Sequence, residues 1–226
     1  MVSVANSWAL SQIKRWHDSF VFSRRVRVLS EMFAARIPEH SSILDVGCGD
    51  GTIASLVAQM RPDVTIHGVE VMHRSGTKIT CDVFNGSTLP FADNSFDICI
   101  FADVLHHTED VATLLEEAVR VSRSHVLIKD HLDEALWDDA TLRFMDWVGN
   151  RPHGVKLTYN YQSREQWSAH FAKCGLVETD WTTQVPLYPW PASLFVGRRL
   201  HFVALLRKAE NIGSNHRKED LIMATV

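Results

Sequence analysis

The stretch Ile-Leu-Asp-Val-Gly-Cys-Gly-Asp-Gly, residues 43–51, decides the fold of this chain. Apolar residues lead into an acidic residue, and glycines then follow at alternate positions, Gly47, Gly49 and Gly51. Glycine is needed where the backbone adopts positive φ or must lie against a ligand. The apolar run after residue 52 predicts a helix, whose first N–H groups can face an acceptor. The stretch therefore predicts a strand, a ligand-binding turn and a helix, which together open a doubly wound α/β fold.

The spacing of these glycines distinguishes between nucleotide ligands. A dinucleotide fingerprint reads G-x-G-x-x-G, and its third glycine allows close helix packing. This chain reads G-x-G-x-G, with Thr52 where that third glycine would fall and Asp45 just before the turn. The pattern resembles motif I of the class I S-adenosylmethionine (SAM) methyltransferases, whose glycine loop wraps the methionine end of the cofactor. A dinucleotide site and an ordinary strand-turn-helix are the alternatives.

Two further stretches extend the resemblance. Residues 65–71 (TIHGVEV) predict a second strand that ends at Glu70. A carboxylate at that edge can accept hydrogen bonds from both hydroxyls of a ribose. Residues 89–97 (LPFADNSFD) resemble the L-P-F-x-D-x-S-F-D stretch of small-molecule methyltransferases, including those of ubiquinone and menaquinone biosynthesis. The chain is thereby identified as similar to the methyltransferase type 11-like, small-molecule group.

The resemblance implies a SAM site at the glycine turn and the neighbouring strand ends, with S-adenosylhomocysteine as the product. The family has an acid shortly before L-P-F that faces the adenine amino group. This chain has Asn85-Gly86 there and Asp82 slightly earlier, so the oxygen of Asn85 is the candidate acceptor. The expected cofactor residues are Asp45, Gly47, Cys48, Gly49, Gly51, Glu70, Val71, Asp82, Asn85, Gly86, Ala102, Asp103 and Leu105.

Composition and charge argue against a nucleic-acid-binding or membrane-spanning protein. The chain has 226 residues and a formal net charge of −4, which favours one domain without a nucleic-acid partner. Its 4 cysteines form no CxxC pair, and no run approaches the roughly 20 apolar residues of a membrane span. We therefore expect a cytoplasmic protein with no membrane partner, while its oligomeric state stays open. We expect no metal, because the adjacent His106 and His107 should diverge and no ligand spacing completes a site.

Alternating strand and helix patterns predict a doubly wound, mostly parallel, seven-stranded sheet. Strands are expected near 42–46, 65–70, 78–82, 97–101, 124–129, 176–184 and 200–207, and helices near 52–60 and 110–122. The family resemblance implies that the last two strands form an antiparallel hairpin. We expect an N-terminal helical cap at 1–37, a SAM-binding domain at 38–208 with a helical and aromatic insertion at about 132–162, and a polar tail at 209–226.

Polar residues follow the fourth and fifth predicted strands, at the edge where α/β sheets bind ligands. His131 and His107 are candidate general bases, because an ordinary histidine titrates near neutrality. Asp130 or Asp103 could orient one of them, whereas Lys129 is expected on the other face of its strand. Methyl transfer is an in-line displacement, so most of the acceleration should come from alignment.

The insertion at about 132–162 is expected to act as a lid over the acceptor. Tyr159 and Tyr161 alternate with Asn160, so their rings should face one side, and Asn150 lies in the adjoining glycine-flanked loop. The predicted function is methyl transfer from SAM to a small molecule, with a histidine base where the acceptor must lose a proton. The alternative is a non-catalytic protein that binds SAM or S-adenosylhomocysteine as a regulatory or scaffold subunit. Neither the acceptor nor the methylated atom type follows from the sequence.

Overall fold

A computed structural model describes residues 22–72, 74–108, 110–143, 159–188, 190 and 199–209. A helix occupies residues 22–34 and a second short helix residues 138–143. The other elements are β1 (Ser42–Val46), α2 (Thr52–Met60), β2 (Thr65–Glu70), β3 (Cys81–Val83), β4 (Phe96–Ala102), the 3-10 helix η1 (Leu105–His107), α3 (Val111–Val121), β5 (Ser122–His131), α5 (Arg164–Lys173), β6 (Leu176–Thr182) and β7 (His201–Lys208).

The strands form one seven-stranded sheet in the order β3-β2-β1-β4-β5-β7-β6. The β3, β2, β1, β4 and β5 strands run parallel, whereas β7 is antiparallel to both β5 and β6. The predicted mostly parallel sheet and its terminal antiparallel hairpin are therefore confirmed. The third strand begins later than expected, at Cys81 instead of near residue 78.

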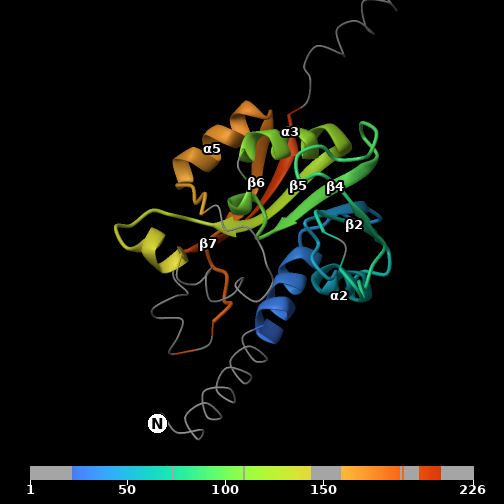
Figure 1. Cartoon of the computed structure of the whole chain (residues 1–226), viewed down its shortest axis with the longest axis horizontal. Helices are drawn as coiled ribbons and strands as arrows, with labels where there is room; N and C mark the ends of the chain where they lie inside the picture. Colours follow the sequence, from blue (N-terminus) through green and yellow to red (C-terminus); the bar gives the residue numbers. More distant parts are fainter. Residues whose placement is uncertain are drawn as a thin grey trace, which may run out of the picture.

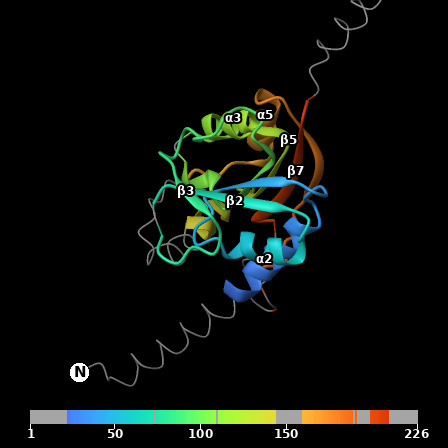
Figure 2. The same ribbon diagram turned by 90° about the vertical axis from the view of Figure 1, so that its right-hand side faces the viewer.

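Helices cover both faces of the sheet (Figures 1 and 2). The α3 and α5 helices lie on one face, and α2 and the 22–34 helix lie on the other. Alternation along the strands supplies both cores, because Leu44 and Phe101 face the α3 layer while Ile43 and Ile100 face the opposite layer. All four side chains are fully buried.

Local capping sets where two of these helices begin. The Asp110 carboxylate accepts from the N–H groups of Ala112 and Thr113 at the start of α3. At α5, Ser163 and Gln166 form a reciprocal capping box, which satisfies N–H groups that lack a partner within the helix. The start of α3 agrees with the helix predicted near 110–122. In the described part of the chain, no helix has the length and apolar character that crossing a bilayer requires.

Several sequence expectations lie outside the described residues. They include residues 1–21 of the expected N-terminal cap, residues 144–158 of the insertion with Asn150, and the tail from residue 210. The described part of the insertion carries the 138–143 helix and, after the gap, Tyr159 and Tyr161.

Candidate functional site

The glycine turn after β1 combines tight packing with one open position. Gly47 and Gly51 both have a φ of 73°. A Cβ atom on Gly47 would lie 2.6 Å from a Val104 methyl group, and one on Gly51 would lie 2.7 Å from Ile79. Gly49 also has a positive φ, but nothing lies within 4 Å of its ideal Cβ position. The fold therefore requires the outer two glycines by packing, whereas the middle one faces space that a ligand can use.

Glu70 closes the other side of this turn. The residue is 7% exposed, and its Oε2 atom accepts from the Gly49 N–H at 2.9 Å. The Oε1 atom accepts from the Val71 N–H at 2.8 Å. A carboxylate has about four lone-pair sites, so Glu70 can accept further hydrogen bonds from a ligand. The acid at the end of β2 is thus fixed against the glycine turn, as the sequence predicts.

Asp45 lies beneath the same turn and is 3% exposed. Burial, followed by the nearby negative charge of Glu70, raises the pKa of Asp45 to about 7. Both effects disfavour the charged carboxylate. A cationic ligand group in this turn would favour ionised Asp45 again, so the arrangement suits a ligand that carries positive charge.

The residues expected around adenine have other partners. The Oδ1 atom of Asn85 accepts hydrogen bonds from the N–H groups of Ser87 and Thr88. An adenine amino group would have to compete with these two hydrogen bonds for the same oxygen. Asp82 is exposed and its carboxylate lies 2.9 Å from His67 Nε2. Gly86 lies next to the residue that follows β2, because its ideal Cβ position is 3.3 Å from a Val71 methyl group.

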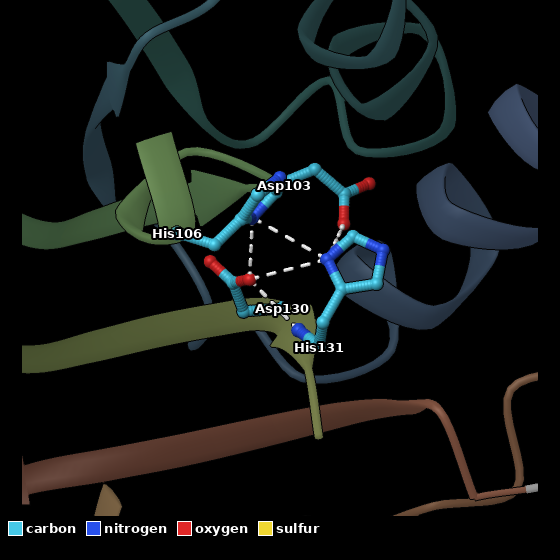
Figure 3. Close-up of side chains that lie close together, drawn as sticks. All are labelled: Asp103, His106, Asp130 and His131. Atoms are coloured by element: carbon cyan, nitrogen blue, oxygen red, sulfur yellow. Dashed lines mark hydrogen bonds and ion pairs between the residues drawn. The ribbon is translucent and has the colours of Figure 1, made fainter. Parts of the chain in front are cut away.

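A buried polar cluster lies at the ends of β4 and β5 (Figure 3). Asp130 is fully buried, and its Oδ1 atom lies 2.7 Å from His106 Nδ1. The same carboxylate accepts from the Leu105 N–H at 3.0 Å and from the His131 N–H at 2.7 Å. Burial raises the pKa of Asp130, but the charges and hydrogen bonds of His106 and His131 outweigh it and leave the pKa far below the usual range. Asp130 is therefore ionised and rigidly held.

His131 completes this cluster. Its Nδ1 atom lies 3.3 Å from His106 Nδ1 and 3.6 Å from Asp103 Oδ1. Burial and the positive charge of Lys129 lower the pKa of His131 to about 4. The expectation that His131 titrates near neutrality is therefore wrong, because sequence alone shows neither its burial nor the neighbouring ammonium group.

Asp103 links the cluster to the N-terminal helix. Lys129 and Arg25 both form ion pairs with its carboxylate. These charges overcome the effect of burial and hold the pKa of Asp103 well below its usual range. Lys129 does lie on the strand face opposite Asp130, as alternation requires, but that face also carries His131 and is part of the site. Arg25 is therefore a part of this edge that the sequence analysis did not predict.

His106, and not the predicted His107, contacts Asp130. The η1 turn directs His106 into the core at 1% exposed, whereas His107 packs against it with ring centroids 4.0 Å apart. His201 is a further residue that the sequence analysis missed, and it lies opposite His131 in the β5–β7 ladder. The sequence analysis considered only that the adjacent His106 and His107 diverge. It therefore predicted neither the contact of His106 with Asp130 nor the position of His201 opposite His131.

The two tyrosines reach the same cluster. The Tyr161 ring is buried, with its centroid 5.6 Å from that of His106 and 5.7 Å from that of His131. The Tyr159 ring lies 6.4 Å from that of Tyr161, and the Arg143 guanidinium lies over it. Tyr161 thus forms one wall of the cluster, with Tyr159 outside it.

Comparison with protein families assigns the core of the chain. Residues 44–128, which include the glycine turn, Glu70 and most of β5, match the methyltransferase domain family. This part of the chain, residues 44–128, is a class I SAM-dependent methyltransferase domain. The ubiquinone/menaquinone biosynthesis C-methyltransferase UbiE of Desulfotalea psychrophila is 29% identical over 93 residues, which are 37% of this chain and 38% of that protein.

Other proteins that are similar to this chain differ in their named acceptors. A 25S rRNA (adenine(645)-N(1))-methyltransferase of Schizosaccharomyces pombe is 28% identical over 49% of this chain and 34% of its own length. The 1,6-didemethyltoxoflavin-N1-methyltransferase of Burkholderia thailandensis, solved with S-adenosylhomocysteine, has a TM-score of 0.61 at 14% identity, covering 93% of this chain and 92% of its own. This likeness supports the fold alone. The matches span between about a third and a half of the length of several curated relatives.

Proposed function

We propose that this protein transfers a methyl group from SAM to a small-molecule acceptor. The observation that carries the proposal is the junction of Gly49 and Glu70, where a rigidly held strand-end carboxylate lies beside an open glycine position. In this proposal Glu70 accepts the ribose hydroxyls, and the turn from Gly47 to Gly51 holds the methionine end. The ionised form of Asp45 favours the cationic cofactor, and S-adenosylhomocysteine is released as the product.

The acceptor is proposed to bind at the β4–β5 edge, against His131 and Tyr161. The polar groups there are mostly buried, and the His131 side chain is only 12% exposed. A small molecule can reach such a recessed group, whereas a large polymer must first expose the reacting atom. The insertion at about 132–162 would position the acceptor, since alignment contributes more to methyl transfer than exclusion of water does.

The proposed role of His131 is to contact the acceptor and not to act as a strong base. A group with a pKa of about 4 is neutral at neutral pH but has little driving force to remove a proton. Asp130 would position His131 and His106 without touching the acceptor. The 1–37 cap would contribute Arg25, whose ion pair with Asp103 joins the N-terminal helix to this edge.

The direct test uses SAM that carries a labelled methyl group. The protein would be incubated separately with small-molecule, RNA and protein fractions, and transfer would be measured in each. We expect label in the small-molecule fraction, with strong loss in Glu70→Ala and no loss in Glu165→Ala, a matched change at an exposed position of α5. Label in RNA or protein would contradict the proposed acceptor class. Tight SAM binding without transfer in any fraction would favour the scaffold alternative.

A further inference from the structure

Three donor atoms converge at the acceptor edge: His106 Nδ1, Asp130 Oδ1 and His131 Nδ1. They form a triangle with edges of 2.7, 3.3 and 3.4 Å. Figure 3 shows the side chains pointing toward one another from η1 and from the end of β5. We propose that these three atoms bind a divalent first-row transition-metal ion. Metal binding does not depend on the proposed methyl transfer, whereas the role of the ion described below does.

The triangle has the size that a metal ion requires. Metal–nitrogen and metal–oxygen bonds of about 2.1 Å place neighbouring ligand atoms roughly 3.0 Å apart at right angles and about 3.4 Å apart in a tetrahedron. The observed edges fall close to this range, with the His106–Asp130 edge somewhat shorter. Only small side-chain shifts are needed to admit an ion between the three atoms.

The ligand types also fit. Two imidazoles and one carboxylate on one face form a ligand set that leaves other coordination positions open. A histidine binds a metal ion through a neutral ring nitrogen, and the Nδ1 atoms of both histidines face the Asp130 carboxylate. The expectation of no metal used the spacing of ligands along the sequence, whereas Asp130 and His131 approach His106 only in the folded sheet.

The three ligands are held before any ion arrives. The second oxygen of Asp130 accepts from the Leu105 N–H, and the Tyr161 ring stacks on His106. Such outer contacts fix ligand orientation in metal sites. The cluster is buried, yet His131 retains some exposure, so the ion would be reached from the side where the acceptor is proposed to bind.

Asp103 is a fourth potential donor, 3.6 Å from His131 Nδ1. Its carboxylate is already paired with Lys129 and Arg25, so we assign it to those cations and not to the ion. The Lys129 charge opposes a second cation nearby and weakens binding. It also favours an anionic atom at an open coordination position, which points to an acceptor with an ionisable oxygen, such as an enol or phenol.

The same geometry has a metal-free explanation, in which His106 donates to Asp130 and His131 joins the hydrogen-bonded network. The two explanations differ in a direct measurement. The purified protein would be stripped with a chelator, titrated with Co²⁺ followed by visible absorption, and separately loaded with Zn²⁺ for elemental analysis. We expect about one equivalent of either ion, with Co²⁺ bands typical of nitrogen and oxygen ligands.

Two variants make this test specific. His131→Gln should weaken Co²⁺ binding at least tenfold, whereas His170→Gln, a matched change on α5 outside the cluster, should leave it unchanged. Circular dichroism would establish that both variants are folded. No stoichiometric binding, or equal binding in both variants, would overturn the metal site. Calorimetry with S-adenosylhomocysteine on the same samples tests the proposed function separately, because that ligand is expected at the glycine turn with or without the ion.

Discussion

The carboxyl edge of the sheet has two halves that are built in different ways. At the β1–β2 half, the ligand-facing groups are a glycine turn and two acids, all within residues 45–70. At the β4–β5 half, polar side chains come from residues as distant as Arg25 and His201, and they meet only after the sheet and the N-terminal helix pack. Cofactor recognition is therefore encoded locally, whereas the acceptor edge depends on tertiary packing.

The largest effect should follow from Asp130→Ala, which would break the centre of the β4–β5 half. The change leaves His106 and the N–H groups of Leu105 and His131 without their buried acceptor. We expect a loss of about 3–5 kcal/mol in the free energy of unfolding, measured in urea. The exposed Asp93→Ala, which removes a surface ion pair with Arg120, should cost less than about 1 kcal/mol. Similar losses in the two variants would contradict a preorganised cluster.

Asp45 gives the β1–β2 half a distinct pH dependence. Its folded pKa of about 7 lies above the value of about 3.8 for an unfolded chain, so its favourable contribution is complete below about pH 4 and is lost as the pH rises to 7. Asp45→Asn should therefore become progressively more stable than the natural protein across this window, by up to about 4 kcal/mol. Urea unfolding at pH 5 and pH 8 measures the difference in unfolding free energy between the two proteins. The contributions of titrating histidines are the same in both proteins and cancel in this difference. A difference that is constant with pH would contradict the buried acid pair.

The glycine turn offers a contrast within one motif. Gly47→Ala should cost more than Gly49→Ala by about 1–3 kcal/mol in unfolding free energy, because only the Cβ atom at position 47 overlaps a neighbour, Val104. Both changes share a cost of about 1–2 kcal/mol for positive φ. Thermal or urea unfolding tests the order. Equal losses would show that the turn relaxes and that packing does not set its shape.

Tyr159→Ala should have the smallest effect on the cofactor half. The ring lies beyond Tyr161 and contacts Arg143, away from the glycine turn. We expect turnover to fall about tenfold, or roughly 1.4 kcal/mol, while cofactor affinity changes less than threefold. Kinetics and calorimetry would be compared on the same sample. A parallel loss of cofactor affinity would show that the two halves are not separate.

The sequence predicts the cofactor half well because its signals are short-range. The apolar run, the glycine spacing and the acid after the second strand are adjacent features, and the structure brings Gly49 and Glu70 into contact. The bounds of β1 and β2 follow for the same reason, whereas the short edge strand β3 begins later than expected.

The acceptor half was less accessible to sequence analysis. The choice of His107 over His106 depended on the direction of the η1 turn, which no periodicity indicates. The contact of Arg25 with Asp103 joins residues 78 positions apart. The lowered pKa of His131 comes from burial and from Lys129, and both require the folded packing. The residues of the acceptor half can be assigned only when the register of β4, β5 and β7 is known, because that register decides which side chains are neighbours.

The most direct test of the account is calorimetry with S-adenosylhomocysteine on the natural protein, Glu70→Ala and Glu165→Ala. Removing the Glu70 carboxylate would leave buried ribose hydroxyls unpaired, so the account predicts binding to the natural protein and to Glu165→Ala, with a loss of about 1–3 kcal/mol, or roughly 5- to 150-fold, in Glu70→Ala. Equal affinity in all three proteins, or binding of NAD in preference to S-adenosylhomocysteine, would contradict the proposed cofactor site.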